Sequence, residues 1–450
     1  MLIVYTISRE IYKTLNRFSR IVLPYKNKRG SVMSQIAGIN RRGFLVRSAA
    51  WTAMSCLAAP HLRAADVRPS NTVTMGIVGI GGRGSQLLPI FMHQNDVRIC
   101  AVCDVVKDHR DRAKATVDAY NGDSSCTAYR DFRDLLARPD IDALYVATGD
   151  RWHAQLAIQT MQAGKDIYCE KPISLCIREG EAVSAAAHRY QRIYQGGVQR
   201  RNVGNFVAAM TLARSGRLGR IHTVHAGMAG MGHSATNHFF PTEAAPDRDV
   251  IDWDLWLGPA AWRPFNAKYL HTWHGEYDFH GDLTEWGSHT VDLCQLMLGR
   301  EHTAPVRYVP MDDTTLNAFY SDGLKLVMRQ NGFRNSCAVR FEGDEGWVET
   351  DDSGDILVSS PTLLEQRKVP SENWMRPVAH PAEFIACVKS RKPTSAPPDS
   401  LHFSHVCCHA ATIAYHLKRE LVFDPATLAF AKDDEANRLL NRPCRSPWYL

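Results

Sequence analysis

Apolar runs alternate with amphipathic stretches along the first half of the chain. The runs are short and rich in Val, Ile and Ala, as in strands buried on both faces, and the stretches between them carry a helical period. Strands are predicted at 73–78, 97–102, 126–128, 143–147, 166–169 and 193–195, and helices at 85–93, 106–120, 131–137, 154–163 and 178–190. This alternation is typical of α/β proteins with a doubly wound parallel sheet.

The pattern changes after about residue 198. Short strands such as those at 221–226, 325–328, 337–341 and 346–350 lie between long loops and a few helices, among them 381–390 and 403–417. This predicts an α+β domain with a largely antiparallel open sheet. The predicted organisation is a leader (1–65), a Rossmann domain (72–198), an α+β domain for substrate and oligomer contacts (199–425) and a tail (426–450).

Charge is distributed unevenly over the 450 residues, whose formal net charge is +6. Residues 1–65 hold 11 of the 53 Lys and Arg but only one of the 47 acidic residues, so the remainder carries a net −4. A mildly acidic body without a basic run gives no case for nucleic-acid binding.

The basic N-terminal segment resembles an export signal. Arg41-Arg42 begins a twin-arginine pattern, an apolar stretch follows at 49–59, and small residues at 64–65 offer a cleavage site. The stretch is too short to span a membrane. We therefore expect an exported, periplasmic or extracytoplasmic protein, with an amphipathic helix as the alternative interpretation and Met33 as an alternative start.

The first predicted strand ends in a glycine-rich turn of the G-x-G-x-x-G type. Such a turn needs glycine for its tight bend, for close approach of a pyrophosphate and for helix packing. Asp104, 20 residues after the turn, can hold the ribose hydroxyls and favours NAD over NADP. The predicted cofactor contacts are Gly79, Ile80, Gly81, Gly82, Arg83, Gly84 and Asp104. The alternative is a purely structural turn.

Two polar groups carry candidate chemistry. Lys171 follows the fifth predicted strand, where ligands of open α/β sheets lie, and a lysine there can polarise a carbinol oxygen. Glu285, His289 and Asp292 share one helix face, so Glu285 can orient His289 as a general base. The alternatives are a surface lysine and a solvated polar face.

These motifs together resemble the Gfo/Idh/MocA family of NAD(P)-dependent oxidoreductases, in a secreted bacterial branch. The resemblance covers about 72–450 and rests on the glycine turn, Ala147-Thr148 with His153, Glu170-Lys171-Pro172 and the Glu285–Asp292 helix. It implies a Rossmann domain, an open sheet that aids homo-oligomer contacts, and a sugar, sugar-acid or cyclitol substrate.

The resemblance also implies roles for particular residues. It makes Lys171 and His289 catalytic, with Glu285 standing where the family often has Asp. It adds Thr148, His153, Glu170 and Lys171 to the cofactor contacts, and Gln199, Arg200 and Asp292 to the substrate contacts. Gly149 replaces a usual proline, and we do not find the histidine-glycine signature of the family's glycosidase branch.

Three functions remain open. The main prediction is hydride transfer between a tightly bound NAD and a carbohydrate-like hydroxyl, because an exported enzyme has no NAD pool to exchange with. The first alternative is a redox-neutral glycosidase or lyase that oxidises a sugar transiently, and the second is a non-catalytic carbohydrate-binding protein.

A histidine-rich stretch raises the question of a metal site, with His271, His274 and His280 beside Asp278 and Asp282. The spacing of these residues fits no closed zinc pattern, and we predict no metal there.

Overall fold

The computed structural model describes residues 71–228, 231, 236–333, 335–364 and 377–449. The chain divides into two compact units, Met1–Val67 and Arg68–Leu450, and every described residue belongs to the second. The predicted twin-arginine signal therefore lies outside the described residues.

The first sheet is fully parallel, with the strand order β3-β2-β1-β4-β5-β6. Its strands are β1 Val73–Val78, β2 Val97–Cys103, β3 Thr127–Tyr129, β4 Ala143–Val146, β5 Asp166–Cys169 and β6 Tyr194–Gly196. The order reverses between β1 and β4, and ligands of such sheets bind at this switch point, outside the carboxyl ends of the strands.

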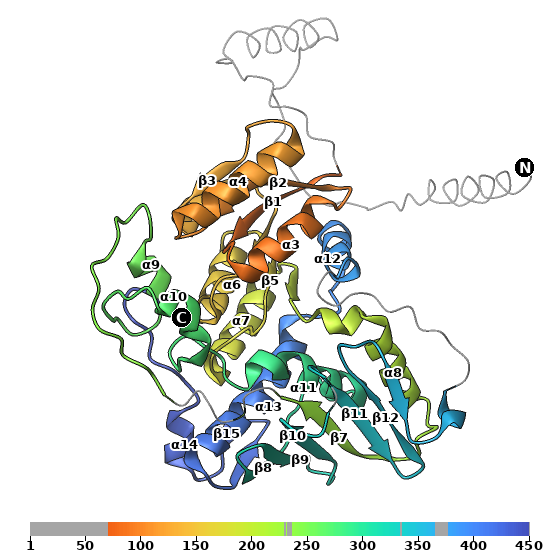
Figure 1. The fold of residues 1–450 in the computed structure, drawn as a ribbon. Helices are drawn as coiled ribbons and strands as arrows, with labels where there is room; N and C mark the ends of the chain where they lie inside the picture. The colour runs from red at the N-terminus through yellow and green to blue at the C-terminus, as the bar shows by residue number, and fades with distance from the viewer. Residues whose placement is uncertain (1–70, 229–230, 232–235, 334, 365–376, 450) are drawn as a thin grey trace, which may run out of the picture. The chain divides into compact units, whose positions relative to one another are not determined.

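Helices cover both faces of this sheet (Figure 1). Their bounds are α3 Gly82–Met92, α4 Lys107–Asn121, α5 Phe132–Leu136, α6 His153–Gln162, α7 Ile177–Tyr190 and α12 Ala379–Ser390. Helices α3, α4 and α12 share one apolar core, while α5, α6 and α7 share the other. Thus α12, far along the chain, completes the layer beside α3.

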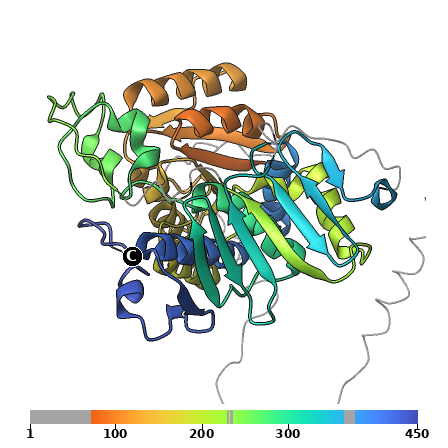
Figure 2. The same cartoon turned by 60° about the horizontal axis from the view of Figure 1, so that its bottom comes forward.

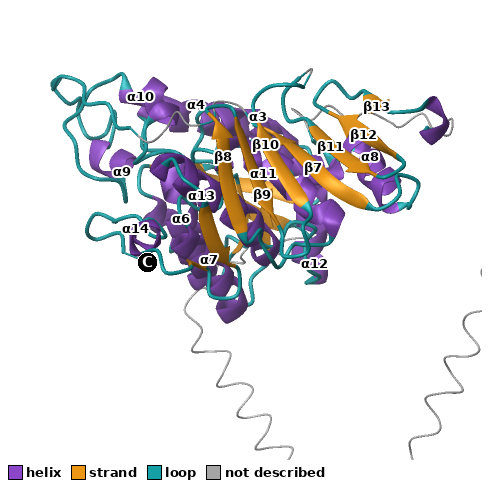
Figure 3. Cartoon of the chain, turned by 90° about the horizontal axis from the view of Figure 1, so that it is seen from below, coloured by secondary structure: helices purple, strands orange, loops and turns teal. Residues whose placement is uncertain are grey.

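The second sheet has nine strands in the order β13-β12-β11-β7-β10-β9-β8-β14-β15 (Figures 2 and 3). They are β7 Ile221–Gly227, β8 Arg307–Asp312, β9 Thr315–Phe319, β10 Lys325–Arg329, β11 Val339–Gly343, β12 Gly346–Thr350, β13 Ile356–Val358, β14 Leu421–Asp424 and β15 Ala429–Phe430. Only the β7–β10 pair is parallel, which confirms the predicted largely antiparallel sheet.

Three helices pack on this sheet through one large apolar core: α8 Gly204–Arg214, α11 Thr284–Leu298 and α13 Pro398–Leu417. Residues of α13 also reach the core of the first sheet, where Leu401 is fully buried. Helix α11 begins at the loop that faces the first sheet and brings Glu285 there. The described part of the chain contains no helix long and apolar enough to cross a membrane.

The long loop at 243–281 is built around a buried cation. It contains the short helices α9 Trp253–Leu257 and α10 Tyr269–Thr272 and the 3₁₀ turn η4 Trp273–Gly275. The Arg263 guanidinium lies 3.2 Å from the Glu276 carboxylate, contacts Asp278 at 2.5 Å and stacks over Phe279. These contacts hold distant parts of the loop together. The loop is attached to the first domain elsewhere, where the Arg151 and Trp152 side chains donate to the carbonyl oxygens of Trp256 and Leu255.

Candidate active site

The glycine turn has the local geometry that a bound phosphate requires. Gly79 has a φ of +85°, and a Cβ on Gly84 would lie 2.1 Å from the Gly79 carbonyl oxygen, so both positions exclude other residues. A Cβ on Gly81 would meet nothing within 4 Å. The backbone at Gly81 is therefore open to a ligand, at the N-terminus of α3.

Asp104 supports this turn from the end of β2. Its Oδ2 accepts a hydrogen bond of 2.7 Å from the Ile80 amide, and its Oδ1 accepts one of 2.8 Å from the Val106 amide. Oδ2 also lies 3.4 Å from Nδ1 of His109, whereas Oδ1 retains a second lone pair, and Asp104 borders the adjacent cavity. The predicted ribose contact is therefore compatible with the structure.

A cavity of about 790 Å³ starts at the glycine turn and extends across the carboxyl ends of the strands to the long loop. At the loop end it is bordered by His271, Trp273 and His274. All the residues predicted to contact NAD, except Ile80 and Gly84, border this cavity. One cavity thus joins the nucleotide end to a second, histidine- and tryptophan-lined end.

Lys171 and Glu285 form an ion pair in the middle of the cavity wall. The Lys171 ammonium lies 2.7 Å from Oε1 of Glu285 and 3.1 Å from its carbonyl oxygen. Burial alone would lower the pKa of Lys171, but the carboxylates of Glu285 and Asp150 raise it, so this lysine stays charged. Burial would likewise raise the pKa of Glu285, yet Lys171 and His280 hold it well below its usual value.

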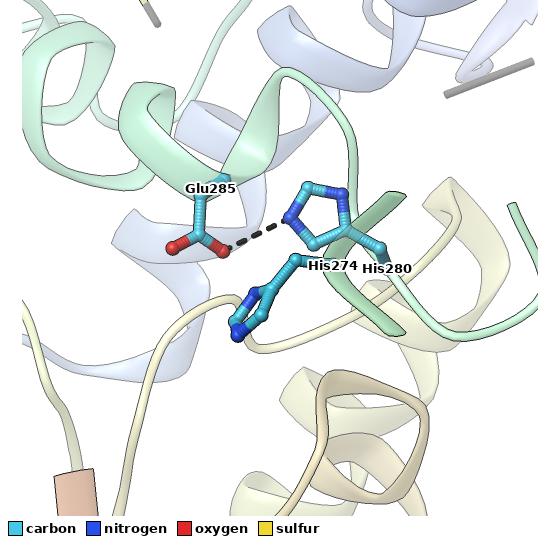
Figure 4. Close-up of side chains that lie close together, drawn as sticks. All are labelled: His274, His280 and Glu285. Carbon is cyan, nitrogen blue, oxygen red and sulfur yellow. Dashed lines mark hydrogen bonds and ion pairs between the residues drawn. The ribbon is translucent and has the colours of Figure 1, made fainter. Parts of the chain in front are cut away.

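The second oxygen of Glu285 contacts His280, and His274 lies beside them (Figure 4). The Asp282 amide donates to Nδ1 of His280, so the proton of the neutral ring is on Nε2, which faces Oε2 of Glu285 at 3.1 Å. Ligand atoms of His274, His280 and Glu285 lie within 4.8 Å of one another. However, a protonated Nε2 and the adjacent Lys171 ammonium both oppose a metal ion there.

His289 does not receive the orientation predicted from helix periodicity. The Glu285 carboxylate contacts Lys171 and His280, and among the described residues Nδ1 of His289 has no hydrogen-bond partner although it is buried. Burial, with the positive charges of Arg200 and Lys171, holds the pKa of His289 well below its usual value. His289 is therefore a neutral imidazole at the cavity wall.

His153 and Thr148 hold the end of β4 and the Lys171-Pro172 turn. The nitrogens of the His153 ring lie 2.7 Å from the Pro172 carbonyl oxygen and 3.2 Å from that of Thr148. His153 is therefore occupied by backbone contacts and positions Lys171. The Thr148 hydroxyl is buried without a partner among the described residues, and Thr148 borders the cavity.

The predicted substrate contacts separate into two kinds. Gln199 and Arg200 border the cavity, and Arg200 is held there by two contacts of 2.8 and 2.7 Å to Asp352. Asp292 is fully buried and pairs with Arg201 at 2.7 and 2.6 Å. Its carboxylate is committed to this internal ion pair, so the predicted substrate contact of Asp292 is wrong.

Glu170 and Arg83 close the wall between the turn and Lys171. The Arg83 Nε lies 3.3 Å from Oε1 of Glu170, and both residues border the cavity. Their predicted place near the cofactor agrees with this geometry.

Asp150 is a site residue that the sequence pattern did not reveal. Asp150 and Thr148 lie just before α6, where polar side chains commonly cap a helix, but neither side chain forms a capping bond there. Instead Oδ2 of Asp150 accepts a 3.2 Å hydrogen bond from the Gly281 amide. Burial, together with the Glu285 carboxylate, raises the pKa of Asp150 to about 7. Its position after a strand at the switch-point edge was the available signal.

The residues present fit a nicotinamide dinucleotide. The open backbone at Gly81, the Asp104 carboxylate at the end of β2, and the unpartnered hydroxyl of Thr148 all face one cavity. Gly79, Gly81, Asp104 and Thr148 would hold the cofactor, with its pyrophosphate at the start of α3.

Two models of one protein family match this chain. The NAD-binding Rossmann fold of the oxidoreductase family matches residues 73–198, and its C-terminal alpha/beta domain matches 235–450. With both domains in their order, the chain belongs to the Gfo/Idh/MocA family.

Curated relatives share part of this chain. A glycosyl hydrolase family 109 protein of Shewanella putrefaciens is 32% identical over 174 residues, which cover 34% of this chain and 38% of that protein. One of Saccharopolyspora erythraea is 40% identical over 111 residues, 24% of each chain. The chain thus matches well under half the length of either. Both bear a glycosidase family name, although we did not find the signature expected of that branch.

Solved structures agree on the fold. GenD2 from gentamicin A biosynthesis, in complex with NAD, superposes with a TM-score of 0.55 at 19% identity, covering 79% of this chain and 97% of GenD2. At this identity the likeness establishes the architecture of the two domains and nothing about the substrate.

Proposed function

We propose that this protein is a redox-neutral glycosidase or lyase that keeps NAD bound and oxidises its sugar only transiently. The observation that carries the proposal is the cavity wall beside the predicted nicotinamide end. There Asp150 and His289 border the cavity together with Lys171 and Glu285, and His280 contacts the Glu285 carboxylate. Hydride transfer alone needs one acid–base pair, whereas elimination at the neighbouring carbon needs further groups to move protons.

The glycosyl hydrolase names of the curated relatives support this alternative better than the net hydride transfer that we predicted first. A nicotinamide held in this cavity would supply a hydride acceptor for the oxidation and a hydride donor for the final reduction. The Lys171 ammonium binds the oxygen of the sugar hydroxyl that is oxidised and stabilises its negative charge. The free Nδ1 of His289 accepts the hydrogen of that hydroxyl.

The paired groups behind Lys171 keep it in place. One oxygen of the Glu285 carboxylate binds the Lys171 ammonium, and the other binds the His280 ring. The carboxylate therefore joins the segment after β5 to the long loop. Because the carboxylate stays ionised, Lys171 keeps its charge when water is excluded by the sugar. The ion pair therefore serves substrate orientation.

The test uses purified protein, aryl glycosides of several sugars and no added cofactor. The proposal expects continuous release of the aryl alcohol without net change in NADH absorbance, together with deuterium from D₂O in the sugar ring. Stoichiometric NADH formation that stops without an external acceptor, and no aryl alcohol, would instead support net hydride transfer. Failure to retain or bind NAD would support the carbohydrate-binding alternative.

We also propose export by the twin-arginine route, because that route carries folded proteins and the cofactor can then be loaded beforehand. The Arg41-Arg42 motif motivates this proposal. The N-terminal sequence of the protein from a periplasmic fraction tests it: cleavage near 64–65 agrees, and an intact N-terminus in the cytoplasm contradicts it.

A further inference from the structure

Lys171, Glu285, His280 and Asp150 form a group of neighbouring charged and titratable side chains, the Lys171 cluster. Within the described residues, Glu285 forms an ion pair with Lys171, whereas Asp150 forms none. It contacts the Gly281 amide through Oδ2, while the Lys171 ammonium is bound to Glu285. The groups that face Asp150 are Glu285 of α11, His280 of the long loop, Lys171 after β5 and the neighbouring Arg151. The Arg151 guanidinium is directed away, onto the carbonyl oxygen and ring of Trp256.

The cluster therefore holds an excess of negative charge when both carboxyl groups are ionised. Lys171 balances one carboxylate. Burial lowers the pKa of His280, and the hydrogen bond to Glu285 with the nearby Asp150 raises it above its usual value, but the ring is neutral as long as its Nδ1 accepts the Asp282 amide. A buried site with two carboxylates and one ammonium favours binding one further proton. Glu285 is stabilised as the anion by two donors, so the proton resides on Asp150.

We infer that Asp150 is a catalytic residue, the group that takes the proton from the ring carbon next to the transiently oxidised carbon and later returns it. This inference rests on the proposed function. Asp150 borders the cavity beside the groups assigned to the hydroxyl. A group used in both directions works best when its pKa lies near the working pH, as the value of about 7 for Asp150 does.

The ionised Asp150 carboxylate removes the proton next to the ketone, the electron pair of that C–H bond forms a carbon–carbon double bond, and the bond to the leaving oxygen breaks. The leaving oxygen takes a proton from water. Addition of water across the double bond then returns the proton from Asp150 to carbon and restores the sugar ketone for reduction by the stored hydride.

The test compares wild type with Asp150→Asn and Asp150→Ala. Asn keeps an oxygen that accepts the Gly281 amide and removes only the ionisable proton, whereas Ala removes both. We expect Asp150→Asn to lower ring deuteration and aryl alcohol release by about 10²–10⁴-fold. Transient NAD reduction on mixing with sugar remains, because Lys171 and His289 are intact. Asp313→Asn, at an exposed turn between β8 and β9, is the matched control.

A second measurement guards against misfolding of the variants. Infrared difference spectra between wild type and Asp150→Asn report the protonated carboxyl, which should titrate near neutral pH. The inference is overturned if Asp150→Asn shows the same ring deuteration and aryl alcohol release as wild type. It is also overturned if the carboxyl group of Asp150 titrates like that of an ordinary aspartate. If wild type reduces NAD but shows neither ring deuteration nor aryl alcohol release, the proposed function is overturned as well. If only the variant comparison fails, the role of Asp150 is overturned and the proposed function stands.

Discussion

The Glu285 carboxylate binds the Lys171 ammonium at 2.7 Å, across 114 residues of sequence, and Nδ1 of His289, one turn along the same helix, has no hydrogen-bond partner within the described part of the chain. The acid–base groups are therefore divided between an ion pair and a neutral imidazole. This division determines which variants should affect chemistry and which should affect its pH dependence.

Replacing Lys171 by Met should lower turnover of the sugar by about 10²–10⁴-fold, the usual contribution of a positioned acid–base group. The substitution removes the charge on the reacting oxygen and leaves Glu285 without its cation. Steady-state kinetics with the aryl glycoside measure the loss, and Lys114→Met on the outer surface of α4 is the control. Unchanged turnover would refute the role of Lys171.

Glu285→Gln should move the pH dependence of proton exchange to lower pH. The Glu285 carboxylate raises the pKa of Asp150, so a neutral amide frees Lys171 to stabilise the Asp150 carboxylate instead. Ring deuteration rises with pH as Asp150 loses its proton and becomes a base, and this rise should occur about one pH unit or more lower in the variant. Ring deuteration measured from pH 5 to 9 reports the shift, with Glu420→Gln as the control. A shift to higher pH would contradict the charge assignment.

Asp150 should also make the folded protein less stable as pH rises. Its pKa is about 7 in the fold and near 3.8 as an ordinary aspartate, so between these values the folded state holds a proton that the unfolded state has released. Stability is thus lost on passing upward through this window. Asp150→Asn lacks the effect, and its melting temperature relative to wild type should be higher at pH 8 than at pH 5. Parallel curves would argue against a protonated Asp150.

The glycine turn offers a matched pair of variants. Gly84→Ala places a methyl group on the Gly79 carbonyl oxygen and should destabilise the apoprotein by about 1–3 kcal/mol. Gly81→Ala meets no protein atom, so the apoprotein should keep its stability while NAD binding weakens. Thermal unfolding without NAD and calorimetric titration with NAD separate the two effects. Equal NAD affinity in Gly81→Ala and wild type would show that the pyrophosphate does not bind at Gly81.

Removal of metal ions should leave activity unchanged. His280 presents a protonated nitrogen to Glu285, and Lys171 occupies the other oxygen of that carboxylate, so the His274–His280–Glu285 group favours hydrogen bonds over metal. Elemental analysis of purified protein and an assay after chelation provide the measurement. Stoichiometric zinc that restores lost activity would show that the cluster rearranges around a metal.

Much of the fold follows from the sequence pattern. Strands β1, β5 and β12 begin and end where the pattern predicts, because short segments rich in apolar, aromatic and β-branched residues lie between turn residues. Strands β8 and β9, and helix α8, were not predicted. Strand β8 contains Pro310 and ends in the exposed residues Met311 and Asp312, so its sequence carries little local signal, and pairing with β9 and β14 holds it in place.

The sequence by itself determined the glycine turn, its acid Asp104 and the candidates Lys171, Glu285 and His289, because strand, turn and acid lie within one short segment and follow local backbone rules. Only the tertiary structure decided how these groups pair. Helix periodicity predicts that Glu285 contacts His289. In the structure Glu285 instead binds Lys171, because opposite charges attract strongly where they are buried. In the sequence Asp150 is placed like a helix cap, but in the structure its hydrogen-bond donor is the amide of Gly281, 131 residues away. Burial and neighbouring charge set its proton affinity, and both depend on contacts far apart in the chain.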